Sequence, residues 1–120
     1  MEPTAVIQCQ LDAFNARDIE TLLAVYADDA EMYEHPSKLV ARGSAELRDC
    51  FTARFREANL HATLVHRIVA GTTVIDHENV RRTFPDGEGE LQLVMIYEVK
   101  DDRIAKAWSV AGTKTLDPKR

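Results

Sequence analysis

Hydrophobic residues recur at helical spacing over the first half of the chain. The repeat over residues 4–16 predicts a first amphipathic helix. A second helix is expected directly after Asp18, because its carboxylate can accept the free amide N–H groups of the first turn. A third helix is expected from residue 43 onward. The three apolar stripes are formed by Val6, Ile7, Leu11 and Phe14, by Ile19, Leu22, Leu23 and Tyr26, and by Leu47, Phe51 and Phe55.

The pattern changes from helical to alternating in the second half of the chain. Residues 31–34 already have the pattern of a short strand that ends at His35-Pro36, since a residue before proline favours extended geometry. After Asn59, turn residues divide the alternating segment into four strands, at about residues 61–70, 72–84, 90–100 and 103–112. Three helices followed by such a meander predict an α+β fold, in which the helices cover one face of a curved antiparallel sheet.

Composition limits the classes of protein and partner. A chain of 120 residues fits a single domain, residues 1–120, that can bury a core without disulfides. The net charge of −5 and the lack of a basic run argue against a nucleic-acid partner. No apolar run approaches the roughly 20 residues that cross a bilayer, and the first residues lack the features of a secretory signal. We therefore expect a cytoplasmic protein with no membrane partner.

The two cysteines add little chemistry. Cys9 and Cys50 are spaced neither as a zinc site nor as a redox pair. We expect two buried, inert thiols, the alternative being that one of them is reactive.

One segment resembles a known superfamily. Residues 13–36, AFNARDIETLLAVYADDAEMYEHP, join two short helices to a strand and a turn. This segment is similar to the opening of the nuclear transport factor 2-like superfamily, in particular its SnoaL-like and ketosteroid isomerase-like branches. The resemblance implies a cone-shaped domain with an apolar cavity, and a homodimer formed through the outer face of the sheet. It does not assign a reaction, because many activities share one fold.

The expected strand pairing suggests which side chains face the cavity. A two-residue turn at Gly71-Thr72 would place His66 opposite His77 and Arg67 opposite Asp76. We assign the face with the two imidazoles to the cavity, because the other face carries the Arg67–Asp76 ion pair together with Glu78. A slip of one residue would reverse this assignment.

The last two predicted strands carry Tyr97 and Trp108, and the strand register decides which face each side chain is on. Pairing Thr83 with Leu91 would set Tyr97 beside His77 on the cavity face. A two-residue turn at Asp101-Asp102 would put Trp108 on that face as well. A bulged turn would instead put Trp108 on an apolar outer face with Val94 and Ile96.

These placements give the candidate site. We expect His35, His77 and Tyr97 to be catalytic, because imidazole titrates near neutrality and a tyrosine hydroxyl can donate to a carbonyl. Each of them can also be a packed or loop-bonding side chain with no chemical role. No metal is expected, since His66 and His77 lack a third ligand, and no cofactor signature is present. The expected ligand contacts are Tyr33, His66, Met95 and Trp108.

The catalytic residues of the ketosteroid isomerase-like branch are not matched. Those enzymes use an aspartate base with a tyrosine and a protonated aspartate as donors. Alignment through the resemblance puts His35 at the base, Gln10 near the tyrosine and Met95 near the protonated aspartate. An epoxide hydrolase-like relay is also not expected, because Arg67 and Asp76 are predicted to point away from the cavity.

Two functions are compatible with these observations. The first is a cofactor-independent enzyme that carries out an isomerisation, dehydration or cyclisation on a small apolar carbonyl compound. The second is a ligand-binding or assembly domain that uses the same cavity without chemistry.

Overall fold

The helices begin and end at residues that favour helix termini. In the computed structural model, which describes residues 1–119, α1 (Pro3–Ala16) starts at a proline and ends at Arg17, whose φ of 55° is left-handed. α2 (Ile19–Ala24) is capped by Asp18, whose carboxylate accepts hydrogen bonds from the Thr21 N–H at 3.2 Å and the Thr21 hydroxyl at 2.7 Å. The cap predicted at Asp18 is therefore confirmed. The last helix, α3, comprises Gly43–Arg54.

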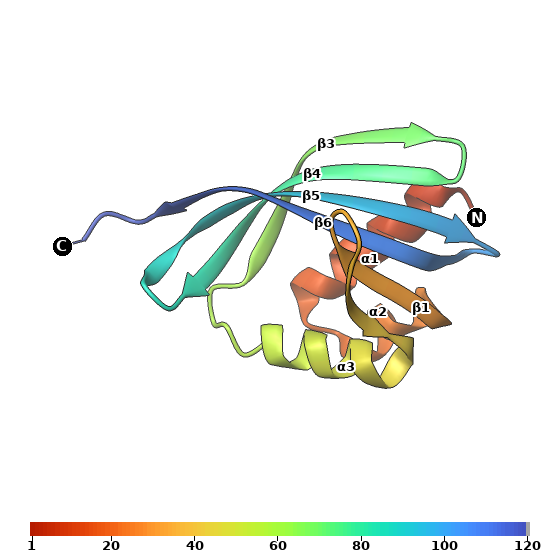
Figure 1. The fold of residues 1–120 in the computed structure, drawn as a ribbon, viewed down its shortest axis with the longest axis horizontal. Helices are drawn as coiled ribbons and strands as arrows, with labels where there is room; N and C mark the ends of the chain where they lie inside the picture. The colour runs from red at the N-terminus through yellow and green to blue at the C-terminus, as the bar shows by residue number, and fades with distance from the viewer. Residues whose placement is uncertain (120) are drawn as a thin grey trace.

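The described residues form one six-stranded sheet with the three helices on one face (Figure 1). The strand order is β2-β1-β6-β5-β4-β3, with β1 parallel to β6 and all other neighbours antiparallel. The α+β class and the helix-covered sheet are as predicted, although the sheet is mixed. The strands are β1 (Tyr26–Glu34), β2 (Lys38–Arg42), β3 (His61–Ala70), β4 (Thr73–Phe84), β5 (Gly87–Lys100) and β6 (Arg103–Leu116).

Strands β1 and β2 differ from the sequence prediction. Tyr26 was expected on the stripe of the second helix, but it is the first residue of β1 and pairs with Ile104 of β6. Tyr26 is buried against Phe51, with ring centroids 5.7 Å apart, so an apolar residue at this position did not reveal that the helix ends before it. The prediction also missed β2, which pairs with the end of β1 across a short turn.

The register of the β3–β4 hairpin is confirmed from the turn back to His66, and a bulge shifts it between Leu64 and His66. His66 pairs with His77, and Arg67 with Asp76, around a turn in which Gly71 has a φ of 61°. This positive φ is accessible to glycine without strain. The strand pairing was therefore predictable from the turn.

The assignment of faces in this hairpin is wrong. The alternate residues Val74, Asp76, Glu78 and Val80 of β4 are the buried ones and face the helices. Arg67 also lies on this side, where its Nη1 donates to Gln8 of α1 at 2.9 Å. An ion pair can be buried when its donors and acceptors are satisfied, so its presence does not mark a solvent face.

The register of β4 and β5 also differs from the prediction. Thr83 pairs with Glu88 instead of Leu91, so Tyr97 lies opposite Val74 and not beside His77. Tyr97 is still on the helix side of the sheet, as expected, and is almost completely buried.

A bulge in β6 decides the position of Trp108. Lys100 pairs with Arg103 across a tight turn, but the register shifts between Glu98 and Val99. Trp108 consequently lies opposite Ile96 on the outer face, which is the outcome of the bulged alternative. None of the helices in residues 1–119 has the length and apolar character to span a bilayer.

Candidate active site

A cavity of about 920 Å³ lies between the helices and the inner face of the sheet. Phe14 of α1 and Phe51 of α3 form part of its apolar wall, and β5 adds Leu91, Leu93 and Met95. On β6 the inner positions are small: Ala107 pairs with Tyr97, Ser109 with Met95, and Ala111 with Leu93. Side chains of this size leave unfilled space in front of the sheet, which explains why a cavity persists here.

Glu78 of β4 projects into this cavity. The residue is 4% exposed, and among residues 1–119 it forms no ion pair or hydrogen bond through its carboxyl group. Burial, and after it the negative charge of Asp76, raises the pKa of Glu78 to about 7. The carboxyl group can therefore hold or release a proton near neutrality.

Asp76 lies two residues earlier on the same face of β4 and is fully paired. Its two carboxylate oxygens accept hydrogen bonds from Arg67 Nε at 2.6 Å and Arg67 Nη2 at 2.8 Å. The Arg67–Asp76 ion pair lies beneath α1 and does not line the cavity. Arg67 thus neutralises Asp76 and only partly offsets the burial of Glu78.

A chain of hydroxyl and amide groups lines the cavity near Glu78. The Tyr97 hydroxyl donates to Gln10 Oε1 at 3.3 Å, and Gln10 Nε2 donates to the Tyr26 hydroxyl at 3.4 Å. Tyr26 accepts in this chain, so its own hydroxyl proton is free to be donated to a ligand. Burial raises the pKa of both tyrosines, which keeps them protonated as donors.

The mouth of the cavity carries charged side chains. Arg82 forms a two-pronged ion pair with Glu57, from Nε to Oε1 and from Nη2 to Oε2, both at 2.8 Å. Arg54, the last residue of α3, approaches the same carboxylate at 3.7 Å. Glu34 and His35, at the end of β1, border the cavity as well.

A family model described as the SnoaL-like domain matches residues 7–107, which is most of the chain. The chain belongs to the SnoaL-like domain family. No curated protein matches this sequence closely enough to be called a relative.

Solved structures share the fold of this SnoaL-like domain. A cystatin-fold protein from Novosphingobium aromaticivorans has a TM-score of 0.84 and 24% identity, covering 91% of this chain and 97% of that one. A candidate ketosteroid isomerase from Kribbella flavida has a TM-score of 0.78 and 21% identity, covering 98% and 83%. A candidate polyketide cyclase from Sinorhizobium meliloti has a TM-score of 0.75 and 21% identity, covering 91% and 99%. At these identities the likeness establishes the fold alone.

Several residues predicted from the sequence do border the cavity of the SnoaL-like domain. Tyr97 and Met95 lie on its inner wall, and His35 lies at its mouth. Tyr33 also borders it, but its ring stacks on Trp108, with centroids 5.8 Å apart. The positions aligned with the catalytic residues of ketosteroid isomerases, Gln10, His35 and Met95, all reach this one cavity.

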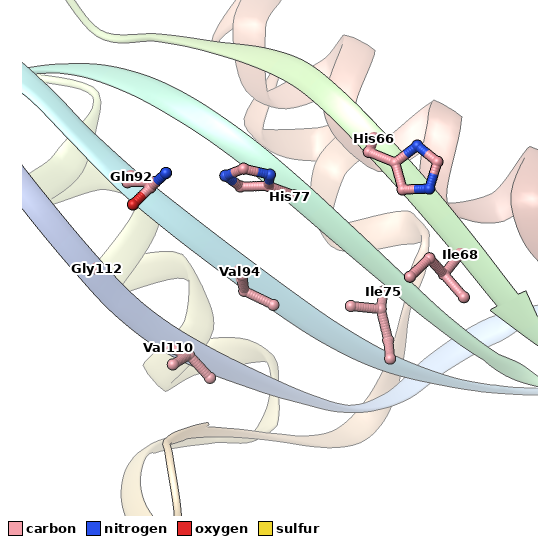
Figure 2. Close-up of a pocket in the computed structure, with 8 residues that line it drawn as sticks. All are labelled: His66, Ile68, Ile75, His77, Gln92, Val94, Val110 and Gly112. Carbon is pink, nitrogen blue, oxygen red and sulfur yellow. The ribbon is translucent and has the colours of Figure 1, made fainter.

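Three predicted residues do not reach the cavity. His66 and His77 lie on the outer face of the sheet, where they line a separate, shallower groove of about 430 Å³ (Figure 2). Figure 2 shows both imidazoles on the side of the strands away from the helices, with Ile75 and Val94. Trp108 is on the outer face as well, because of the bulge in β6. The prediction that His66 and His77 face the cavity is wrong, and Trp108 takes the outer one of its two predicted positions, so the ligand contact expected of it is not made in the cavity.

Glu78 was missed because the two faces of the hairpin were exchanged. The alternation of the sequence shows that Asp76, Glu78 and Val80 share a face, and the register fixes Arg67 beside Asp76. The sequence signal that could have identified Glu78 is a carboxylate on the same strand face as the Arg67–Asp76 ion pair. The sequence pattern did not show that this ion pair would be covered by α1.

The cysteines differ from expectation too. Cys9 is exposed, and Cys50 is partly buried and lines the cavity one turn before Arg54. The expectation that both are buried is therefore wrong. Among residues 1–119, no group of three or more His, Cys, Asp and Glu side chains is placed to hold a metal ion.

Proposed function

We propose that this SnoaL-like domain is a cofactor-independent enzyme that moves a proton within a small, mostly apolar carbonyl compound. The single observation that supports this most strongly is Glu78, an unpaired carboxyl group with a pKa of about 7 on the wall of a cavity that β5 lines with apolar side chains. Such a pKa lets one group act as base and as acid at neutral pH.

The proposed reaction begins with proton removal. The Glu78 carboxylate takes a proton from a carbon next to the substrate carbonyl. The electron pair of the broken C–H bond forms a C=C bond, and the π pair of the C=O bond moves to the carbonyl oxygen. The Tyr26 hydroxyl donates a hydrogen bond to the resulting enolate oxygen, where charge develops. Tyr97 orients Gln10, and Gln10 holds Tyr26, so both act as positioning residues.

The second half of the reaction returns the proton. If Glu78 delivers it to a different carbon, the result is an isomerisation. If it delivers the proton to a departing hydroxyl group, the result is a dehydration. Attack of the enolate carbon on a second carbonyl would give a cyclisation, with the proton going to the new alkoxide. Met95 would contact the substrate on the inner wall, and His35 would do so at the mouth.

A neutral carbon acid tests the proposal without knowledge of the natural substrate. A base that removes the C3 proton of 5-nitrobenzisoxazole breaks the N–O bond and releases a coloured nitrophenolate. We expect the chain to accelerate this ring opening, with a rate that rises with pH and has its midpoint near 7, because only ionised Glu78 accepts the proton. Glu78→Gln is expected to lower the rate by roughly 100-fold.

The matched control is Glu98→Gln, a carboxylate exposed on β5. It should leave the rate unchanged, and circular dichroism should show that both variants are folded. Equal rates for Glu78→Gln and wild type would refute the role of Glu78.

A binding domain without chemistry is the second candidate. The observation that favours it is that Gln10 and Met95 carry no acidic group, although they occupy positions aligned with ketosteroid isomerase donors. In that case the cavity would bind 5-nitrobenzisoxazole without opening its ring.

We also propose that two copies of the chain associate through the outer sheet face. This face carries the partly or fully exposed side chains of Ile68, Ile75, Val94, Ile96, Trp108 and Val110. From strand spacing and rise, the apolar patch covers on the order of 300 Å². A patch of that size with a polar rim fits the centre of a standard interface, and a second copy offers the same patch across a two-fold axis.

A further inference from the structure

Two arginines at the mouth of the cavity, Arg54 and Arg82, approach a single carboxylate, that of Glu57. Both oxygens of Glu57 are engaged by Arg82, and Oε1 also accepts the Thr83 N–H at 2.9 Å. Arg54 reaches the same carboxylate only at 3.7 Å, which is beyond hydrogen-bond distance. Two guanidinium groups therefore share one carboxylate, which leaves a net charge of about +1 at this wall.

Arg54 is the guanidinium that remains available. Its side chain is 45% exposed and forms part of the cavity wall. Among residues 1–119 it makes no hydrogen bond to the protein, so its five N–H donors can meet a ligand. Partial burial, and then the nearby Arg82 guanidinium, lowers the pKa of Arg54, which indicates a charge that its surroundings do not fully compensate.

The position of this charge relative to Glu78 defines a length. Glu78, Val80 and Arg82 are alternate residues of β4 and all line the cavity. At about 3.4 Å per residue, the backbone positions of Glu78 and Arg82 are ~14 Å apart. Arg54 lies at the Arg82 end, because both guanidinium groups approach the carboxylate of Glu57. The wall between them is apolar and consists of Val80 with Leu91 and Leu93 of β5.

The described residues on the other side of the mouth, Glu34 and His35, do not add a second uncompensated positive charge. Glu34 lies 3.8 Å from Lys38, and the His35 backbone N–H donates to the Ser109 carbonyl at 2.8 Å. An anionic group entering the cavity is therefore attracted to Arg54 and repelled from the Glu78 end, which fixes the direction in which a ligand lies.

We propose that the substrate is a carboxylic acid with an apolar body, whose carboxylate binds Arg54 at the mouth while its carbonyl segment lies at Glu78. The planar carboxylate matches the two parallel N–H donors of a guanidinium. This inference rests on the proposed function, because Glu78 supplies the reacting end. The proposed substrate class is thereby narrowed from any apolar carbonyl compound to keto acids and related acids. Their length should match the ~14 Å between the Glu78 and Arg82 positions.

The test compares two probes that differ in charge and have nearly the same shape. These are 2-naphthylacetate and 2-naphthylacetamide, whose binding is followed by isothermal titration calorimetry. We expect wild type to bind the acetate about tenfold more tightly than the amide, a difference of about 1.4 kcal/mol, because only the acetate forms a hydrogen-bonded ion pair with the guanidinium. Arg54→Met should remove this preference by weakening the acetate and leaving the amide unchanged.

The control variant is Arg56→Met, which removes an exposed arginine two residues later. It should keep the preference for the acetate. Equal affinity of wild type for the two probes, loss of both probes in Arg54→Met, or no binding of either probe would overturn the inference. Thermal unfolding should verify that both variants are folded.

This outcome is separable from that of the proposed function. Ring opening of 5-nitrobenzisoxazole is a reaction of a neutral compound and does not need Arg54, whereas binding of naphthylacetate does not need proton transfer by Glu78. A chain that opens the ring without preferring the acetate would retain the proposed function and lose the substrate class. The opposite result would retain the anion site and lose the enzyme.

Discussion

Glu78 and Asp76 are two carboxylates on one face of one strand, yet only Asp76 has a partner. Asp76 is fully buried and receives both hydrogen bonds from Arg67, so its charge is compensated where it lies. Glu78 faces the cavity beside the apolar side chains of β5, and its ionised form lacks that compensation. The different chemistry of the two residues comes from their surroundings and not from their type.

The raised pKa of Glu78 has a consequence for stability. The pKa is about 7 in the folded chain and returns to the ordinary 4.5 in the unfolded chain, so the folded state binds the proton more tightly. The free energy of unfolding should therefore fall as pH rises from about 4.5 to 7. Because a shift of this size corresponds to roughly 3 kcal/mol, we expect Glu78→Gln to be more stable than wild type by about that amount at pH 8.

Urea unfolding at several pH values measures this difference. It should shrink as pH falls and vanish near pH 4, where Glu78 is protonated in both states. Glu98→Gln serves as the control and should show no such pH-dependent gain. A stability difference between Glu78→Gln and wild type that stays constant with pH would contradict the raised pKa.

At the scale of the elements, local signals predicted more than long-range ones. The Asp18 cap and the Gly71 turn involve residues close in sequence, and the structure confirms both. The turn after Phe84 and the bulge in β6 shift strands by a few residues, and the hydrophobic pattern alone did not fix those shifts. Because neighbouring residues of a strand face opposite sides, even a one-residue shift in β6 moved Trp108 to the outer face.

The choice between the faces of β4 depended on an element distant in sequence. Both faces carry aliphatic residues and two or more polar ones, so composition did not distinguish them. The deciding contact is Gln8 of α1 with Arg67, across 59 residues of sequence. Tyr97, Met95 and His35 were thus predictable from the sequence as residues at the cavity, and Glu78 was not.

At the scale of the whole molecule, the helices cover one face of the sheet and leave the other open (Figure 1). The exposed groove on that outer face includes Ile75, Val94 and Val110 (Figure 2). Exposed apolar surface of this kind favours association, because burying it against a second copy removes it from water. The cavity lies on the opposite side of the sheet, so dimer formation would leave it accessible.

Sedimentation equilibrium tests the proposed dimer. We expect wild type to have twice the chain mass at micromolar concentration, and Ile96→Lys to be a folded monomer, because a charge buried at the centre of the patch lacks a partner. Leu116→Lys changes an exposed leucine at the end of β6, outside the patch, and should remain dimeric. A monomeric wild type would contradict the dimer and leave the outer face to a different protein.

The central claim is that Glu78 is an acid–base group with a pKa near neutrality inside the cavity. Its most direct test is an NMR titration of the Glu78 side-chain carboxyl carbon in the ¹³C-labelled chain, with Glu78→Gln used to assign the resonance. The account predicts a midpoint at about 7. A midpoint near the ordinary 4.5 would show that the carboxylate is ionised and solvated, and would contradict the account.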